Sequence, residues 1–244
     1  MKRYFAKIQY NGANYHGWQI QDNARTVQGE INRALELLLA KPIKTTGCGR
    51  TDAGVNASEF YFHFDADSLF ENFAYRLNAV LDNDIVIKNI TEVKPESHAR
   101  FDAISRTYHY FIHTNPNPFL GDFSCFIRYG LDIDKMNEAA NLLLKTTDFT
   151  SFSKLHTENY TNNCDVTFAK FHELEHGELR FEITADRFLR NMVRAIVGTL
   201  VEVGNGKISL QDFQKIINSK DRQNAGKSMK GEALFLAGVG YDYV

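Results

Sequence analysis

The sequence predicts an α+β protein built from two related lobes. Strand-like segments alternate with helical periodicity along the whole chain, and both halves have a similar order of strands and helices, although no sequence repeat is visible. A polar segment at residues 95–105 separates the halves. We therefore predict one lobe at 1–105 and a second at 106–244, each with helices against one face of a sheet.

Composition limits the classes of function. The net charge of −2 gives no overall basic field, so nucleic-acid binding would require a local patch. The cysteines Cys48, Cys125 and Cys164 are far apart, which favours a reducing cytoplasm over a disulfide framework. The spacing of cysteines and histidines does not predict a metal site. No apolar signal segment follows Met1, and no apolar run of about 18 residues predicts a membrane span.

In the first lobe, alternating residues predict a strand at 3–10, which ends at Asn11 and Gly12. Thr26 is a candidate N-cap for a helix to about Ala40. Its predicted buried face is Ile31, Ala34, Leu35 and Leu38. A strand at 60–64, a helix at 69–81 and a strand at 85–93 follow. The inward residues of that second helix are predicted to be Phe70, Phe73 and Leu77.

In the second lobe, the pattern predicts a strand at 106–112 and a helix at 134–145. Strands at 166–174 and 179–184 form a predicted hairpin around residues 175–177. A long helix is predicted from Asp186 to about Val203. Ser209 and Asp212 resemble a capping box that opens a helix to Asn218, and a final strand is predicted at 233–241.

The chain is organised around a glycine-rich loop at residues 47–57, which contains Arg50, Thr51 and Asp52 and is followed by an apolar strand. Such a loop is either a surface turn with an Arg/Asp pair or a catalytic loop on a rigid sheet. It lacks the ending of a phosphate-binding P-loop, the fingerprint of a dinucleotide fold and the serine of a nucleophile elbow. No second carboxylate accompanies Asp52 in this loop, which disfavours a glycosidase pair.

Other candidate binding residues also allow two interpretations. The predicted helix from Asp186 carries a basic stripe, which is either a solvated face or a phosphate track; its residues are Arg187, Arg190, Asn191 and Arg194. Tyr108 is either core packing or a platform on which a nucleobase stacks. Trp18, with Gln19, either anchors its loop or contacts nucleic acid. Lys227 lies in a loop at 226–231 that either binds phosphate or is a solvated turn.

Four motifs, in order and spread over nearly the whole chain, resemble those of the tRNA pseudouridine synthase A family. They are residues 15–21 (YHGWQIQ) with 26–28 (TVQ), 49–55 (GRTDAGV), 100–103 (RFDA) with 106–110 (RTYHY), and 188–194 (FLRNMVR) continuing through 198–200 (GTL) to 203–204 (VG). The resemblance implies isomerisation of uridine to pseudouridine in the tRNA anticodon stem-loop, at positions thirty-eight to forty. It implies the pseudouridine synthase fold, with two ferredoxin-like lobes of antiparallel or mixed sheets meeting around a central positively charged cleft. It also implies a cytoplasmic homodimer in which one tRNA contacts both subunits, with neither a metal nor an organic cofactor.

The resemblance also implies roles for individual residues. Asp52 matches the essential aspartate, and Arg194 matches an arginine expected to pair with it. Tyr108 matches a tyrosine that stacks on the flipped uracil. The remaining matches are Arg50, thought to assist extrusion of the base, and Leu234, which packs against the site. With tRNA as the partner, the substrate-binding residues are expected to include Arg187, Arg190, Lys227, Trp18 and Gln19.

The sequence departs from the family pattern at a few positions. Asn11 stands in place of an aspartate, Asn56 in place of a histidine and Ala233 in place of a glycine, and the loop before Ala233 lacks the usual proline. None of these changes removes an expected catalytic group. Two alternatives remain: a non-catalytic tRNA-binding relative, which the presence of Asp52, Tyr108 and Arg194 disfavours, and an unrelated α+β hydrolase that uses Asp52 without a partner acid.

Overall fold

The computed structural model describes residues 1–154 and 160–243, and the chain divides into two compact units. One unit comprises Met1–Ile104 and Phe235–Val244, and the other comprises Ser105–Leu234. The sequence division places the last strand in the second lobe, whereas in the structure it belongs with the first unit. Within that unit, Phe235 and Leu236 pair with Asn56 and Ala57, and the Val239 N–H donates to the Glu59 carboxylate at 3.2 Å.

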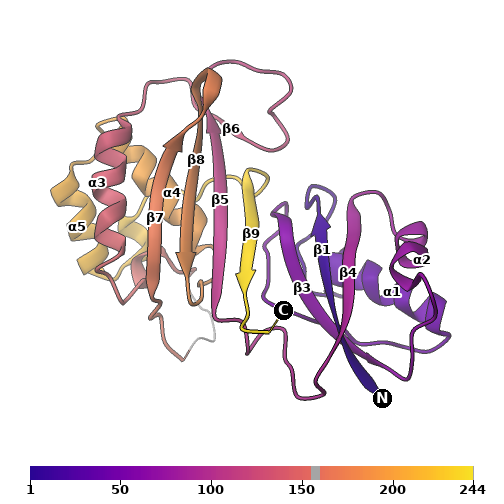
Figure 1. Cartoon of the computed structure of the whole chain (residues 1–244). Helices are drawn as coiled ribbons and strands as arrows, with labels where there is room; N and C mark the ends of the chain where they lie inside the picture. Colours follow the sequence, from indigo (N-terminus) through magenta and orange to yellow (C-terminus); the bar gives the residue numbers. More distant parts are fainter. Residues whose placement is uncertain (155–159, 244) are drawn as a thin grey trace. The chain divides into compact units, whose positions relative to one another are not determined.

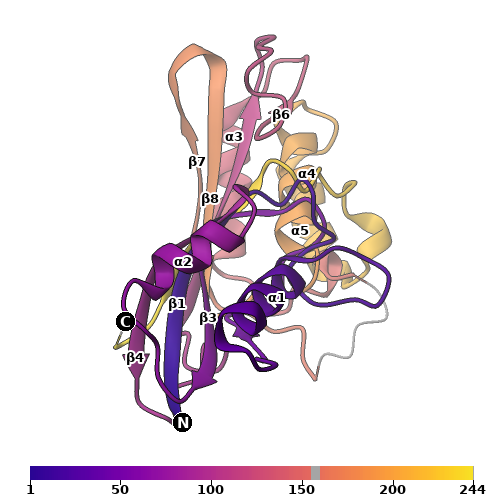
Figure 2. The ribbon, with the colours of Figure 1, turned by 90° about the vertical axis from the view of Figure 1, so that its right-hand side faces the viewer.

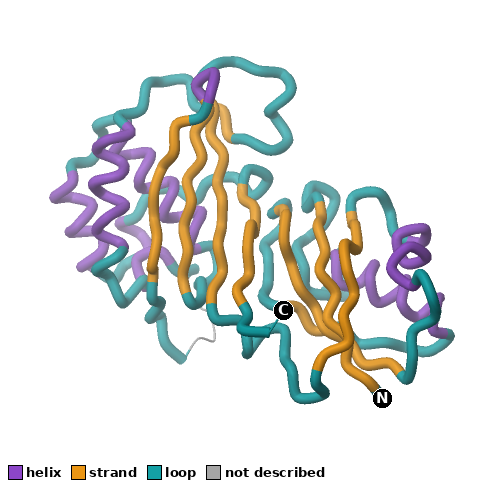
Figure 3. The backbone as a smooth tube through the Cα atoms, viewed as in Figure 1, coloured by secondary structure: helices purple, strands orange, loops and turns teal. Residues whose placement is uncertain are grey.

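The first unit contains a sheet with the strand order β4-β1-β3-β9 (Figures 1 and 3). Its strands are β1 (Lys2–Tyr10), β2 (Thr46–Gly47), β3 (Asn56–Ala66), β4 (Ile85–Val93) and β9 (Leu234–Gly240). β1 is antiparallel to β3 and β4, and the short β2 is antiparallel to β3. β9 runs parallel to β3, with Asn56 opposite Phe235. A parallel pair requires a long connection, and here that connection contains the second unit.

Helix α1 (Val27–Leu39) begins as the sequence predicts. Thr26 is its N-cap, and the Thr26 hydroxyl accepts a hydrogen bond from the Gly29 N–H at 3.3 Å. Of the predicted inward residues, Ile31, Ala34 and Leu35 are buried, whereas Leu38 near the end of the helix is only half-buried. This apolar stripe therefore packs the helix into the core of the first unit.

Helix α2 (Phe73–Val80) is shorter than the predicted helix at 69–81. Asn72 precedes it with a φ of 58°, a left-handed conformation that does not continue an α-helix. Phe73 and Leu77 are buried as predicted, but Phe70 is 39% exposed, so the prediction that it points inward is wrong. The left-handed residue separates Phe70 from the helix on which the prediction placed it.

The second unit has a sheet with the order β5-β8-β7, formed by the antiparallel strands β5 (Ser105–His113), β8 (Glu178–Ala185) and β7 (Val166–Glu173). The short β6 (Cys125–Phe126) runs parallel to β5. Helices α3 (Ile133–Leu143), α4 (Met192–Gly204) and α5 (Leu210–Ser219) lie on one side of this sheet (Figures 1 and 2). The core of the unit includes Tyr110, Ile112, Phe181 and Ile183. The predicted α+β class is therefore confirmed.

The start of α4 differs from the prediction. The periodicity placed the helix start at Asp186, but α4 begins at Met192. The Asp186 carboxylate accepts hydrogen bonds from the N–H groups of Asp165 and Arg187, both at 2.7 Å, and so holds an irregular segment after β8. Asn191 then has a φ of 66°, which separates that segment from the helix. By contrast, the predicted capping box of Ser209 and Asp212 is present at the start of α5.

In the part of the chain that the structure describes, none of the helices is long and apolar enough to span a membrane. Within the same residues, no group of three or more His, Cys, Asp or Glu side chains is arranged to hold a metal ion.

Candidate active site

The loop that carries Asp52 begins where β2 ends and finishes where β3 begins. The Cys48 N–H donates to the Tyr61 carbonyl at 2.7 Å, which extends the contact of the loop with β3 by one residue. The Val55 N–H donates to the Asp52 carbonyl at 3.2 Å and closes a turn around Ala53 and Gly54. Gly54 has a φ of 76°, which a type II turn requires at its third position. Asp52 thus opens a defined turn with its side chain half-buried.

The segment before α1 packs backbone to backbone against this turn. A Cβ on Gly12 would lie 2.1 Å from the Val55 carbonyl oxygen, and one on Gly17 would lie 2.3 Å from that of Thr51. Gly17 also has a φ of 87°, which side chains disfavour. The Trp18 N–H donates to the Thr51 carbonyl at 3.3 Å. The glycines therefore allow a close approach that no other residue would permit.

Trp18 is almost completely buried, at 1% exposure. Its ring lies 4.2 Å from that of Phe60, measured between centroids, and a Cβ on Gly47 would lie 2.6 Å from the indole. With the indole packed this deeply, Trp18 anchors its loop, the first of the two roles that the sequence leaves open. Gln19, the next residue, is exposed.

A small polar pocket of about 160 Å³ lies beside the loop, within the first unit. Its lining includes Gln19, Thr46, Gly49, Arg50 and Arg100. Both arginine side chains are exposed, and no carboxylate belongs to this lining. The sequence predicts a role for Arg50 but none for Arg100, although Arg100 opens one of the four motifs. Only the fold brings residue 100 beside residue 50.

In the second unit, Tyr108 lies on β5 opposite Ile183. Its ring meets that of Phe188 edge to face, with 5.1 Å between centroids and an interplanar angle of 85°. Phe188 belongs to the irregular segment before α4. That segment therefore supports one edge of the tyrosine ring, which is half-buried.

Arg194 lies in the first turn of α4. Its Nε–H donates to the Met229 carbonyl at 2.6 Å, and the Met229 N–H donates to the Arg194 carbonyl at 3.1 Å. The hydrogen bond at Nε fixes the orientation of the planar guanidinium group. This reciprocal pair links α4 to the loop at 226–231.

The loop at 226–231 is packed against α4 along its length. A Cβ on Gly198 would lie 1.9 Å from the Lys227 carbonyl oxygen, and the Gly226 N–H donates to the Thr199 hydroxyl at 3.0 Å. The backbone of Lys227 is thus fixed, whereas its side chain is exposed. The loop is an ordered clamp on α4 and not a free turn.

Arg187 and Arg190 do not form the helical stripe that the sequence predicts. Both precede α4, so the spacing that aligned them with Arg194 does not apply. Arg187 is half-buried and Arg190 is exposed. The Arg190 carbonyl accepts from the Lys154 N–H at 3.1 Å, a contact within the second unit. Because these arginines lie on irregular backbone, the helical spacing in the sequence does not predict where their side chains point.

The remaining candidate, Leu234, is 5% exposed at the start of β9, and its N–H donates to the Gly231 carbonyl at 2.9 Å. In the first unit lie Asp52, Arg50, Trp18 and Gln19. In the second lie Tyr108, Arg187, Arg190, Arg194, Lys227 and Leu234.

Comparisons with known proteins define the class and then the family. The family model described as tRNA pseudouridine synthase matches residues 139–242. The tRNA pseudouridine synthase A of Porphyromonas gingivalis is 50% identical over 99% of this chain and 98% of its own length. Those of Bacteroides thetaiotaomicron and Bacillus subtilis are 47% and 38% identical, over 99% and 96% of this chain and 91% and 97% of their own lengths. The chain belongs to the tRNA pseudouridine synthase A family.

Proposed function

We propose that this protein converts uridine to pseudouridine in tRNA, in the anticodon stem-loop at positions thirty-eight to forty. The observation that carries the proposal is the identity of 47% to 50%, over 99% of the chain, with relatives named tRNA pseudouridine synthase A. The ordered loop around Asp52 supports it, because a carboxylate on a rigid turn is suited to act on a substrate held beside it.

The reaction breaks the bond between N1 of uracil and C1′ of the ribose and forms a new bond between C5 and C1′. C5 loses a proton, and N1 gains one, so the product is an isomer of the substrate. Asp52 is the proposed essential group. As a nucleophile it would add to the sugar or the base; as a base it would remove the C2′ proton to give a glycal. Both routes require Asp52 in its ionised form.

The remaining catalytic roles are assigned by the same proposal. Arg194 is the counter-charge for Asp52, a role that favours the ionised carboxylate. Tyr108 stacks on the extruded uracil, and its edge-to-face contact with Phe188 supports this role by fixing the ring. Arg50 occupies the space that the extruded base leaves, and Leu234 packs against the site.

Contacts with the RNA backbone are proposed for exposed or half-buried basic and polar side chains. They are Arg187, Arg190, Lys227 and Gln19. We add Arg100, because it lines the pocket that also contains Arg50 and Gln19. Two guanidiniums that line one pocket suit a phosphate group. Trp18 contributes by anchoring the loop that presents Gln19.

The proposal predicts that Asp52→Asn abolishes pseudouridine formation while leaving folding and tRNA binding largely intact, because the amide keeps the shape of the side chain and removes its charge. The measurement is release of tritium from tRNA labelled at uracil C5, since each isomerisation frees the C5 hydrogen. Asp67→Asn is the matched control, because Asp67 is an exposed aspartate paired with Lys41 elsewhere in the first unit. A wild-type protein that binds tRNA but releases no tritium would instead be a non-catalytic binding module.

We also propose that the protein acts in the cytoplasm as a homodimer, with one tRNA contacting both subunits. The described cysteines Cys48, Cys125 and Cys164 form no disulfide, which supports a reducing compartment. The expected mass by light scattering is about twice 27.9 kDa. A mass near 27.9 kDa at assay concentration would contradict the dimer and leave the proposed reaction untouched.

A further inference from the structure

The residues on either side of Asp52 are held by Tyr10, the last residue of β1, and by the segment between β1 and α1. We propose that the buried hydroxyl pair of Tyr10 and Thr51 positions Asp52 for the reaction, so that these two residues act on catalysis through Asp52. The inference rests on the proposed role of Asp52 and extends it to residues that do not touch the reacting atoms.

The first contact lies immediately before the carboxylate. The Tyr10 hydroxyl and the Thr51 Oγ1 are 2.8 Å apart, and the two residues are 4% and 8% exposed. Thr51 is also held through its backbone, because its carbonyl accepts from the Trp18 N–H. Both the side chain and the main chain of the residue next to Asp52 are therefore fixed.

The other side of the turn is held in a similar way. The Gly54 N–H donates to the Tyr15 carbonyl at 3.2 Å. The Asn56 Oδ1 accepts from the Gly12 N–H at 2.8 Å, and Asn56 is 1% exposed. The Asn56 side chain thus supplies the acceptor for a backbone N–H of the segment before α1. Contacts on both sides thus leave the Asp52 backbone little freedom.

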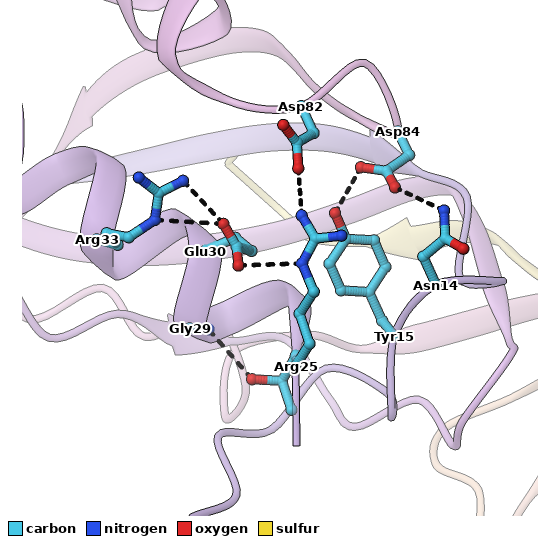
Figure 4. Close-up of polar contacts among 9 residues, drawn as sticks. Asn14, Tyr15, Arg25, Gly29, Glu30, Arg33, Asp82 and Asp84 are labelled. Atoms are coloured by element: carbon cyan, nitrogen blue, oxygen red, sulfur yellow. Dashed lines mark hydrogen bonds and ion pairs between the residues drawn. The ribbon is translucent and has the colours of Figure 1, made fainter. Parts of the chain in front are cut away.

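The segment that holds the turn is itself anchored, as Figure 4 shows for its Tyr15 end. The Tyr15 hydroxyl donates to the Asp84 carboxylate, and burial followed by that carboxylate raises the pKa of Tyr15. The Arg25 guanidinium lies 4.9 Å from the centre of the Tyr15 ring and forms ion pairs with Glu30 and Asp82. These contacts give Tyr15, whose carbonyl accepts from the Gly54 N–H, a defined place in the first unit.

A buried hydroxyl pair has two separable effects. As a stabilising contact, the pair would raise the free energy of unfolding of the first unit without changing the kcat of the folded protein. As a positioning contact it would raise kcat, because a small displacement of a catalytic group costs rate even in a folded enzyme with bound substrate. Since Tyr10 makes other contacts as well, a double-mutant cycle is needed to isolate the pair.

The test uses Tyr10→Phe, Thr51→Val and the double variant in the full-length protein, with tritium release measured at saturating tRNA. Both substitutions keep the apolar bulk and remove one hydroxyl. We expect each single variant to lower kcat about 10-fold, with the KM and the Kd for tRNA within about 2-fold of wild type. The double variant should also be about 10-fold slower, instead of about 100-fold, because the hydroxyls act as a pair. Thr51→Ser, which keeps the hydroxyl, should recover most of kcat.

The matched control is Ser151→Ala. The Ser151 hydroxyl is 1% exposed and donates to the Ile216 carbonyl at 2.6 Å in the second unit, so this variant removes a buried hydroxyl bond that lies next to no candidate site residue. This variant should keep wild-type kcat. If Tyr10→Phe and Thr51→Val also keep wild-type kcat, or if Thr51→Ser is as slow as Thr51→Val, the positioning role is wrong.

Failure of the proposed function has a different result. If Asp52→Asn retains activity, Asp52 is not the essential group and the positioning of Asp52 is excluded with it. If Asp52→Asn is inactive and the hydroxyl variants are fully active, the proposed function stands and the positioning role fails. If the hydroxyl variants lose kcat only in proportion to the fraction unfolded, measured by Trp18 fluorescence, the pair is a stabilising contact and the proposal is overturned.

Discussion

The two units position their candidate catalytic groups by different means. In the first unit, Asp52 lies on a loop, which is fixed by hydrogen bonds from the end of β1 and the loop after it and by the close approach of Gly12 and Gly17. In the second unit, Tyr108 lies on a strand and Arg194 on a helix, and the clamp at 226–231 holds that helix at Gly198. Residues 52–54 are half-buried or exposed, whereas most of α4 is buried, so displacing the turn disrupts less packing than displacing the helix. The same kind of glycine contact should therefore affect activity in one unit and stability in the other.

The largest expected effect on stability is that of Gly198→Ala. Its Cβ would lie 1.9 Å from the Lys227 carbonyl oxygen, so α4 or the clamp must move within a packed core. We expect the free energy of unfolding to fall by about 3 kcal/mol, measured by urea denaturation with circular dichroism. Gly130→Ala is the control, because a Cβ there meets nothing within 4 Å. If the two variants are equally stable, residues 226–231 can move away from α4 without loss of stability, and the expected difference between the units is wrong.

Gly17→Ala tests the first unit. Its Cβ would lie 2.3 Å from the Thr51 carbonyl oxygen, at a φ of 87° that alanine disfavours. We expect kcat to fall about 100-fold because the Asp52 turn is displaced, while stability falls by only about 1 kcal/mol. Tritium release and urea denaturation measure the two effects. A loss of stability as large as that of Gly198→Ala, with kcat preserved in the folded fraction, would remove the contrast between the units.

The smallest expected effect is a dependence of the first unit on pH. His63 is 6% exposed, and its Nδ1 accepts from the Ala99 N–H at 3.0 Å, a bond that requires an unprotonated nitrogen. Burial, then the charge of Arg3, lowers the pKa of His63 to about 4. The unfolded chain binds a proton near the ordinary histidine pKa, so stability is complete above that value and falls as the pH decreases toward 4. Between pH 7 and pH 5 the expected loss is about 2 kcal/mol.

Fluorescence of Trp18, the single tryptophan, measures this loss in the first unit specifically. His63→Gln should be less stable at neutral pH but should lose less stability between pH 7 and pH 5. His176→Gln is the control, since the His176 side chain is 85% exposed. An unchanged pH dependence in His63→Gln would assign the acid sensitivity to another group.

Local patterns predict the elements of this protein well and their endpoints less well. Thr26 and the capping box at Ser209 are side-chain signals that lie next to the helices they start, and both are confirmed. The start of α4 is missed because the arginine spacing continues backward through Asp186 and Asn191, where side-chain bonding and a left-handed residue interrupt the helix. Phe70 is misplaced for the same kind of reason, a left-handed Asn72.

The sequence predicts the motifs that carry the candidate site residues, but not the contacts that hold these residues in place. The loop around Asp52 and the strand of Tyr108 are visible in the sequence, and the family is correctly identified from the four motifs that include them. The pairing of Tyr10 with Thr51 joins residues 41 positions apart, and that of β3 with β9 joins segments much farther apart. The local spacing of apolar and polar residues does not predict such contacts, because they arise from the packing of loops and from strand order.

The order of the strands has a consequence for synthesis of the chain. β9 is translated after the whole second unit, so the β3 edge at Asn56 and Ala57 has no parallel partner while residues 105–233 emerge from the ribosome. Until then the first unit has an open sheet edge next to the loop of Asp52, and an open edge invites pairing with other chains. The sheet of the first unit is consequently completed late in translation, although most of its residues are among the first to be made.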